Sequence, residues 1–176
     1  MKIERTGEGV YVTRGEVVSI GIENLEVLKR EANENKLKRA RLCTHQSVED
    51  KLHEMFIVLA QESYVRPHKH IGKAESTHII EGHADAVFFD DTGNVNEVIQ
   101  LGDFSSGSRF YYRINTERYH TLLIRSPYLV MHEVTSGPFI RENNVFMPQS
   151  PEGKDEVVVR DYVNSLEKQV DSFHSQ

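Results

Sequence analysis

The chain has 176 residues, a length typical of one domain with a substantial hydrophobic core. Hydrophobic residues make up 38% and charged residues 27%, which excludes a collagen-like chain; no apolar run approaches the roughly 18 residues that span a bilayer. The formal net charge of −6 excludes the basic footprint of a nucleic-acid-binding protein. Because the single cysteine, Cys43, cannot form an internal disulfide and no secretory signal begins the chain, we expect a cytoplasmic protein.

The first fifty residues predict strands followed by a helix. Residues 9–21 alternate apolar and polar side chains around a glycine, which predicts two short strands or one hairpin. Apolar residues then recur at helical spacing over 25–32, with Asn24 as the N-cap and Asn35 as the end. We expect residues 1–50 to pack on a β-barrel formed by the next segment.

The middle of the chain, residues 51–140, predicts an antiparallel sandwich or barrel. Short β-rich runs alternate with turns rich in Gly, Pro, Asn and Asp, a pattern typical of many short strands. These runs are residues 56–59, 77–80, 86–89, 95–101, 110–114, 120–124 and 128–134. Residues 90–94, Asp-Asp-Thr-Gly-Asn, predict a hairpin turn between two of them.

The last segment, residues 141–176, contains the pattern of an amphipathic helix. Apolar side chains recur every three or four residues over 155–173, at Val159, Val163, Leu166, Val170 and Phe173. We expect this stripe to pack on the β body. The alternative is a dimer contact, although two heptads are few for an independent coiled coil.

The nine histidines are the unusual feature of the composition. His68 and His70 are two residues apart, so both rings face the same side of an extended segment. Glu75 follows a turn at Gly72 and can fold back as an anionic ligand, and His120 opens a later strand as a fourth candidate. Three imidazoles and one carboxylate suit a divalent Fe, Mn, Ni, Cu, Co or Zn ion. Four such ligands leave two positions of an octahedral ion open, which favours a catalytic site over a structural one.

The spacing His-x-His-x₄-Glu-x₆-Gly, ending at Gly82, resembles the first conserved motif of the cupin superfamily. The glycine usual six residues before the first histidine is Glu62 here. The second motif is more degraded, because only His120 matches within 115–120 and Ile124 stands where the family has Asn. The resemblance implies an all-β core, the cupin-type double-stranded β-helix or jelly-roll barrel, with a short N-terminal helix and a C-terminal helix.

Three stretches look like the WbuC family of cupin-fold metalloproteins: residues 39–45, 63–70 and 146–153. The similarity runs from Asn24 to Leu166, and the residues before it look like an addition. Members of this family are known from bacterial surface-polysaccharide gene clusters, and their reaction is not established. The resemblance therefore implies a metal and a small polar ligand related to sugars, without naming a substrate.

Four other side chains are candidates for the pocket around the metal. Strand parity predicts Tyr64 and Arg66 on the face of the histidine pair, where Arg66 would bind a substrate anion or pair with a nearby acid. Tyr112 would supply a phenol at the pocket rim, and His132 would line the pocket or serve as a structural histidine. His78 has the opposite parity to Glu75 and should face away from the ligands.

Two classes of function follow. The first is a metal-dependent enzyme that acts on a sugar or sugar nucleotide by Lewis-acid chemistry, as an isomerase or epimerase, with an Fe(II) dioxygenase as an alternative. The second is a non-catalytic sugar-binding or scaffold module. The His-x-His-x₄-Glu spacing argues against a metal-free epimerase, and no catalytic acid or base can be identified. A homodimer is the default expectation for a β-barrel of this size.

Overall fold

The structure is a computed structural model that describes residues 2–174. Its two helices are α1 (Ile22–Glu34) and α2 (Glu156–His174), and short 3₁₀ turns lie at Phe104–Ser106 and Arg141–Asn143. Its strands are β1 (Lys2–Gly7), β2 (Val10–Arg14), β3 (Arg39–Cys43), β4 (Leu52–Ala60), β5 (His68–His70), β6 (Glu75–Glu81), β7 (His83–Phe89), β8 (Val95–Gly102), β9 (Tyr111–Ile114), β10 (Tyr119–Ile124), β11 (Tyr128–Ser136) and β12 (Asn144–Phe146). Within the described residues, no helix combines the length and apolar character needed to cross a membrane.

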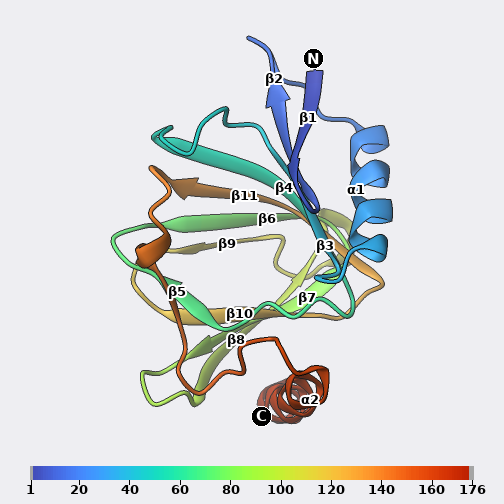
Figure 1. The fold of residues 1–176 in the computed structure, drawn as a ribbon. Helices are drawn as coiled ribbons and strands as arrows, with labels where there is room; N and C mark the ends of the chain where they lie inside the picture. The colour runs from blue at the N-terminus through green and yellow to red at the C-terminus, as the bar shows by residue number, and fades with distance from the viewer. Residues whose placement is uncertain (1, 175–176) are drawn as a thin grey trace.

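The strands form two sheets that face each other (Figure 1). The larger sheet has the order β1-β2-β3-β4-β11-β6-β9, and the smaller has the order β12-β5-β10-β7-β8. If the eight strands from β4 to β11 are numbered one to eight, the two orders contain 1-8-3-6 and 2-7-4-5. This arrangement is a jelly roll, as expected from the resemblance to cupins. The N-terminal strands extend one sheet and β12 extends the other.

The core lies between the two sheets because side chains alternate along each strand. On β11, Leu129 and Met131 point inward, where they pack with Leu122 and Ile124 of β10. Val130, between them, belongs to a separate cluster on the outer face of the larger sheet. This alternation decides which polar side chains can reach the space between the two sheets, which we call the cup.

Each helix covers the outer face of one sheet (Figure 1). Leu28 and Ala32 of α1 pack on Leu42, Val58 and Val130 of the larger sheet. Helix α1 starts slightly earlier than predicted, at Ile22. Asn24 is therefore not the N-cap but lies inside the first turn, where its side chain accepts a hydrogen bond from the Gly21 N–H at 2.9 Å. Asn35 ends the helix as predicted.

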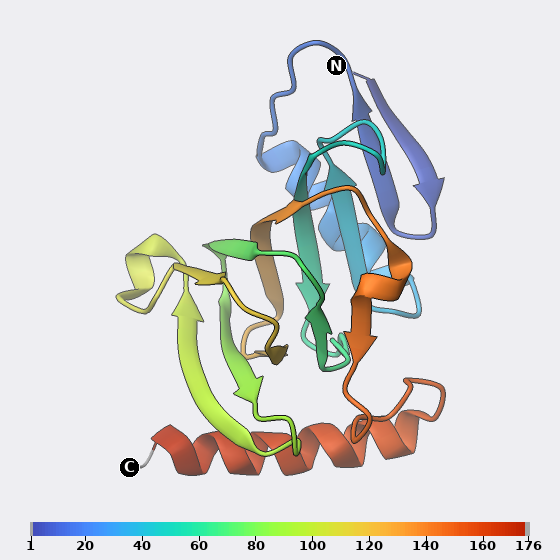
Figure 2. The ribbon, with the colours of Figure 1, turned by 90° about the vertical axis from the view of Figure 1, so that its left-hand side faces the viewer.

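The C-terminal helix packs on the β body, which confirms the preferred interpretation of its apolar stripe. Leu166 and Val170 are buried against Val87, Phe89 and Leu123 on the outer face of the smaller sheet. Figure 2 shows α2 running across the ends of the β elements at the bottom of that view.

The seven predicted β-rich runs all lie in strands, and the Asp90–Asn94 segment forms the predicted turn, with Gly93 at φ 91°. Four strands lie outside the predicted strand runs: β1, β3, β12 and β5, which was expected only as an extended segment. β1 forms a hairpin with β2, and β12 is a short edge strand whose pairing with β5 depends on tertiary contacts.

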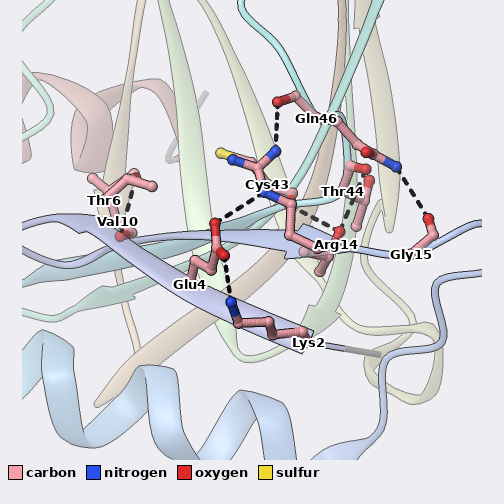
Figure 3. Close-up of polar contacts among 10 residues, drawn as sticks. Lys2, Glu4, Thr6, Val10, Arg14, Gly15, Cys43, Thr44 and Gln46 are labelled. Atoms are coloured by element: carbon pink, nitrogen blue, oxygen red, sulfur yellow. Dashed lines mark hydrogen bonds and ion pairs between the residues drawn. The ribbon is translucent and has the colours of Figure 1, made fainter.

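The N-terminal hairpin is held to the larger sheet by side-chain contacts as well as by the parallel pairing of β2 with β3 (Figure 3). Arg14 donates to Glu4 at 3.0 Å and to the main-chain oxygen of Gln46 at 2.8 Å. The Gln46 side chain in turn donates to the Gly15 oxygen at 3.0 Å. These contacts join the added hairpin to the segment that follows β3.

The packing of α2 predicts a difference between two identical substitutions. Val170 is fully buried, whereas Val158 on the same helix is 51% exposed. Val170→Ala should lower the free energy of unfolding by about 2 kcal/mol, from lost burial and the cavity left behind. Val158→Ala should change it by less than about 0.5 kcal/mol. Urea unfolding monitored by circular dichroism measures both, and equal effects would contradict the packing described for α2.

Candidate metal centre

Two neighbouring strands bring three histidines together. His68 and His70 lie on β5 and point to the same side, and His120 on β10 stands directly opposite His68 in the strand register. One ring nitrogen from each histidine lies within 4.8 Å of the others. The group can therefore hold a metal ion, as the spacing in the sequence predicts.

The other nitrogen of each ring is fixed by a hydrogen bond that points away from the group. Nδ1 of His68 lies 2.8 Å from the Arg66 oxygen, and Nδ1 of His120 lies 3.0 Å from the Arg118 oxygen. Nδ1 of His70 lies 2.6 Å from the side-chain oxygen of Asn144. Because these oxygens can only accept, each Nδ1 carries a hydrogen, and each ring can offer the lone pair of Nε2 to an ion when the ring is neutral.

Glu75, at the start of β6, completes the group from the opposite sheet. Its side chain is buried; one carboxylate oxygen lies 2.8 Å from Nε2 of His70 and the other 3.7 Å from Nε2 of His120. Two ligands bound at about 2.1 Å and at right angles to one ion lie about 3.0 Å apart. Nε2 of His120 is buried and has no hydrogen-bond partner. A divalent cation between these groups would bind the unpartnered Nε2 of His120 and the Glu75 carboxylate, whose distance from His70 is close to that of two ligands on one ion.

The charges of the group follow from its burial. Burial lowers the pKa of His68 to about 4 and also lowers that of His120, so both rings stay neutral near pH 7. Burial, the largest single effect, also opposes charge on His70 and Glu75. Their mutual hydrogen bond, together with the surrounding charges and hydrogen bonds, outweighs it, so the pKa of His70 is raised and that of Glu75 is lowered. Metal binding requires neutral rings around an ionised carboxylate. His68 and His120 already meet this requirement, whereas His70 must give up the proton that it shares with Glu75.

Glu133 is a further inward carboxyl that sequence reasoning missed. It stands opposite Thr77 in the β11–β6 register, so Glu75 is its diagonal neighbour, a separation of about 7–8 Å on a sheet face. Burial and the charge of Glu75 raise its pKa well above the ordinary value, which favours the protonated form. Glu133 lies two and four residues after the inward-facing Met131 and Leu129, and this period of two in the sequence could have predicted that it also faces inward.

The structure corrects the positions expected for Tyr64 and Arg66. The Tyr64 hydroxyl donates to the Pro151 oxygen at 3.0 Å, and Arg66 donates to the Ser150 hydroxyl at 3.1 Å. Both side chains join the loop before β5 to the C-terminal segment. The parity argument failed because residues 61–67 form a turn and an irregular segment, so side chains do not alternate there as they do in a strand.

The other two pocket candidates also differ from expectation. Tyr112 points inward but is only 7% exposed, so it lies deeper than a rim position; burial and the charge of Glu75 raise its pKa. His132 lies on the outer face of β11, where its ring stacks on Phe56 at 4.9 Å and its Nε2 is 3.8 Å from Glu54. It shares its parity with Val130 and cannot line the cup. His78 faces outward toward Phe110, as predicted.

Comparison with protein families gives one match: residues 20–101 match the model of a Domain of unknown function (DUF6016). No curated protein matches the sequence.

Solved structures similar to the chain have low sequence identity. Protein SO0799 from Shewanella oneidensis has a TM-score of 0.50 at 10% identity, over 60% of this chain and 72% of that one. A cupin superfamily protein from Desulfitobacterium hafniense has a TM-score of 0.43 at 16% identity, over 56% and 76%. L-ribose isomerase from Cellulomonas parahominis, solved with L-ribose, has a TM-score of 0.49 at 13% identity, over 64% and 70%. The strand order and the similarity to protein SO0799 support the fold alone, a jelly roll.

The hydrogen bond of Asn144 predicts an effect on metal affinity. Asn144→Ala removes the acceptor that fixes His70, and loss of such a partner costs about 10–100-fold in affinity. Asn143→Ala, one residue earlier, should leave affinity within about twofold because that side chain does not hold a ligand ring. Competition with a chromophoric zinc chelator measures both. Equal affinities for the two variants would show that Asn144 does not orient His70.

The low pKa of His68 predicts acid sensitivity of the metal-free protein. The ordinary pKa of a histidine is 6.5, and the pKa of His68 in the folded protein is about 4. Between these two pH values the unfolded chain therefore binds more protons than the folded one. The stability that neutral His68 contributes is present above pH 6.5 and is lost as the pH falls toward 4, up to about 3 kcal/mol. His68→Gln should flatten this part of the stability profile, and His83→Gln, at the exposed start of β7, is the matched control. Parallel profiles for wild type and His68→Gln would contradict the burial of the ring.

Proposed function

We propose that this chain is a cupin-fold metalloprotein that holds one divalent first-row ion with His68, His70, Glu75 and His120. The observation that supports this most directly is the convergence of three imidazole groups whose Nδ1 atoms are all tied outward. Donors of this type suit Fe, Mn, Ni, Cu, Co or Zn, and supply decides which ion is bound in the cell.

We further propose that the protein is an enzyme. Four protein ligands leave open positions on an octahedral ion, which as a Lewis acid polarises a carbonyl or a pair of hydroxyls. Glu133 lies on the same inner face with a raised pKa, so it is a candidate to give a proton to a bound molecule or to take one from it. Isomerase and epimerase chemistry needs such a proton donor, and this supports the enzyme over a structural scaffold.

The proposed ligand is a small sugar or sugar nucleotide of surface-polysaccharide biosynthesis. The support is the resemblance of three stretches to the WbuC family, two of which contact each other in the fold. Met147 donates its main-chain N–H to the Pro67 oxygen at 2.9 Å, and Arg66 stacks over the Phe146 ring at 4.6 Å. That ring also contacts His68, with the centroids 6.4 Å apart. The homodimer and the cytoplasmic location stay predictions.

Metal analysis tests the proposed site. Purified protein should contain about one divalent ion per chain, and the double variant His68→Ala/His70→Ala should lose it, because two of four donors are gone. The matched control is His78→Ala/His83→Ala, which removes two histidines outside the cup and should keep the ion. Elemental analysis after gel filtration gives the stoichiometry.

Full metal content in the His68→Ala/His70→Ala variant would end the assignment. Loss of metal from both double variants would mean that the fold rather than the site had been disturbed, and thermal unfolding of each variant separates these results.

A further inference from the structure

A groove of about 280 Å³ opens between β8 and β9, the edge strands of the two sheets. Its floor includes Phe88, Ile99 and Tyr112, whose side chains belong to the interior cluster. The loop after β9 forms its rim, with Asn115 and Thr116 exposed. The groove thus lies where the edges of the two sheets meet, over side chains of the interior cluster.

The groove lies next to the candidate metal centre. The Phe88 ring is 6.3 Å from the ring of His120, and Ile114 stands directly opposite Glu75 in the β6–β9 register. Arg118, also in the groove wall, accepts the Nδ1 hydrogen bond of His120 with its main-chain oxygen. Three lining residues are therefore immediate neighbours of the residues proposed to bind the ion.

The polar groups of the groove form a pair of opposite charges. The Arg118 guanidinium lies over the Phe88 ring at 4.9 Å and donates to Glu97 at 2.5 Å and to the Asn96 side chain at 2.6 Å. The pair sets a fork of donors beside a carboxylate acceptor with no net charge between them. Hydroxyl groups both donate and accept, so adjacent hydroxyls of a neutral polyol can bond to both partners.

The dimensions and the floor limit the ligand further. A volume near 280 Å³ is at the low end of ligand pockets, roughly nine times the space of one water, which suits about ten non-hydrogen atoms. A pentose has ten such atoms and a hexose twelve. Ile99, the partly exposed apolar side chain of the groove, suits the C–H face of a sugar ring.

We propose that this groove is the pocket through which a neutral monosaccharide unit reaches the metal centre, with Arg118 and Glu97 binding adjacent hydroxyls. The inference rests on the proposed metal site and adds to it the location, size and charge of the ligand. It places the sugar on the β8–β9 side of the cup, away from β3 and β4.

Titration of isotope-labelled, zinc-loaded protein with single sugars tests this. The probes are D-glucose, D-galactose, D-mannose, D-xylose, L-rhamnose and D-fructose. At least one should shift the amide signals of Tyr112, Ile114, Asn115 and Thr116. Arg118→Gln should weaken that binding at least tenfold, as expected for loss of a charged hydrogen-bond donor. Thr116→Trp, at an exposed position that fills the groove, should abolish it.

The control is Arg109→Gln, which removes an exposed arginine outside the groove and should change affinity by less than twofold. Zinc content is measured in every sample, so failure of the metal site and failure of the groove give different results. Zinc bound at one ion per chain with no sugar binding, with shifts confined to β3 and β4, or with an unchanged affinity in Arg118→Gln would overturn the proposal. A chain that takes up no zinc would end both proposals.

Discussion

The arrangement that the rest of the site depends on is electrostatic. Three imidazole rings and an ionised carboxylate meet in a partly buried place, and hydrogen bonds at Nδ1 prevent the rings from turning away. Such a cluster of acceptors is costly to bury unless something positive lies among them. In the metal-free chain His70 partly serves this purpose, because its raised pKa lets it share a proton with Glu75. A divalent cation would satisfy all four groups at once.

The jelly roll makes this meeting possible because it places strands from distant parts of the chain on facing sheets. β5 and β10 belong to the smaller sheet and supply the histidines, whereas β6 belongs to the larger sheet and supplies Glu75. The helices lie on the outer faces, so neither of them blocks the interior. The same alternation that buries Leu129 and Met131 turns Glu133 toward the cup. The packing of the core and the placement of the acid are thus one consequence of strand geometry.

Much of this could be predicted from local patterns. The seven β-rich runs, the C-terminal stripe and the pair His68 and His70 depend on periodicity within a single element, which the sequence displays directly. Predictions failed where geometry was not periodic. Tyr64 lies in an irregular segment, so counting residues from His68 could not orient its side chain. The pairing of β12 with β5, and with it the role of Asn144, depends on a contact between residues 74 positions apart.

The site has two distinct sides within one cup. On the β11 side stands Glu133, whose pKa is raised by burial and by the charge of Glu75. On the β9 side lies the groove that Tyr112 helps to line. The most direct measurement is a crystal structure of the metal-loaded protein with anomalous diffraction. The account predicts one anomalous peak about 2.1 Å from Nε2 of all three histidines and from a Glu75 oxygen. A peak located elsewhere, or Glu75 turned toward bulk solvent with no ion among the rings, would contradict it.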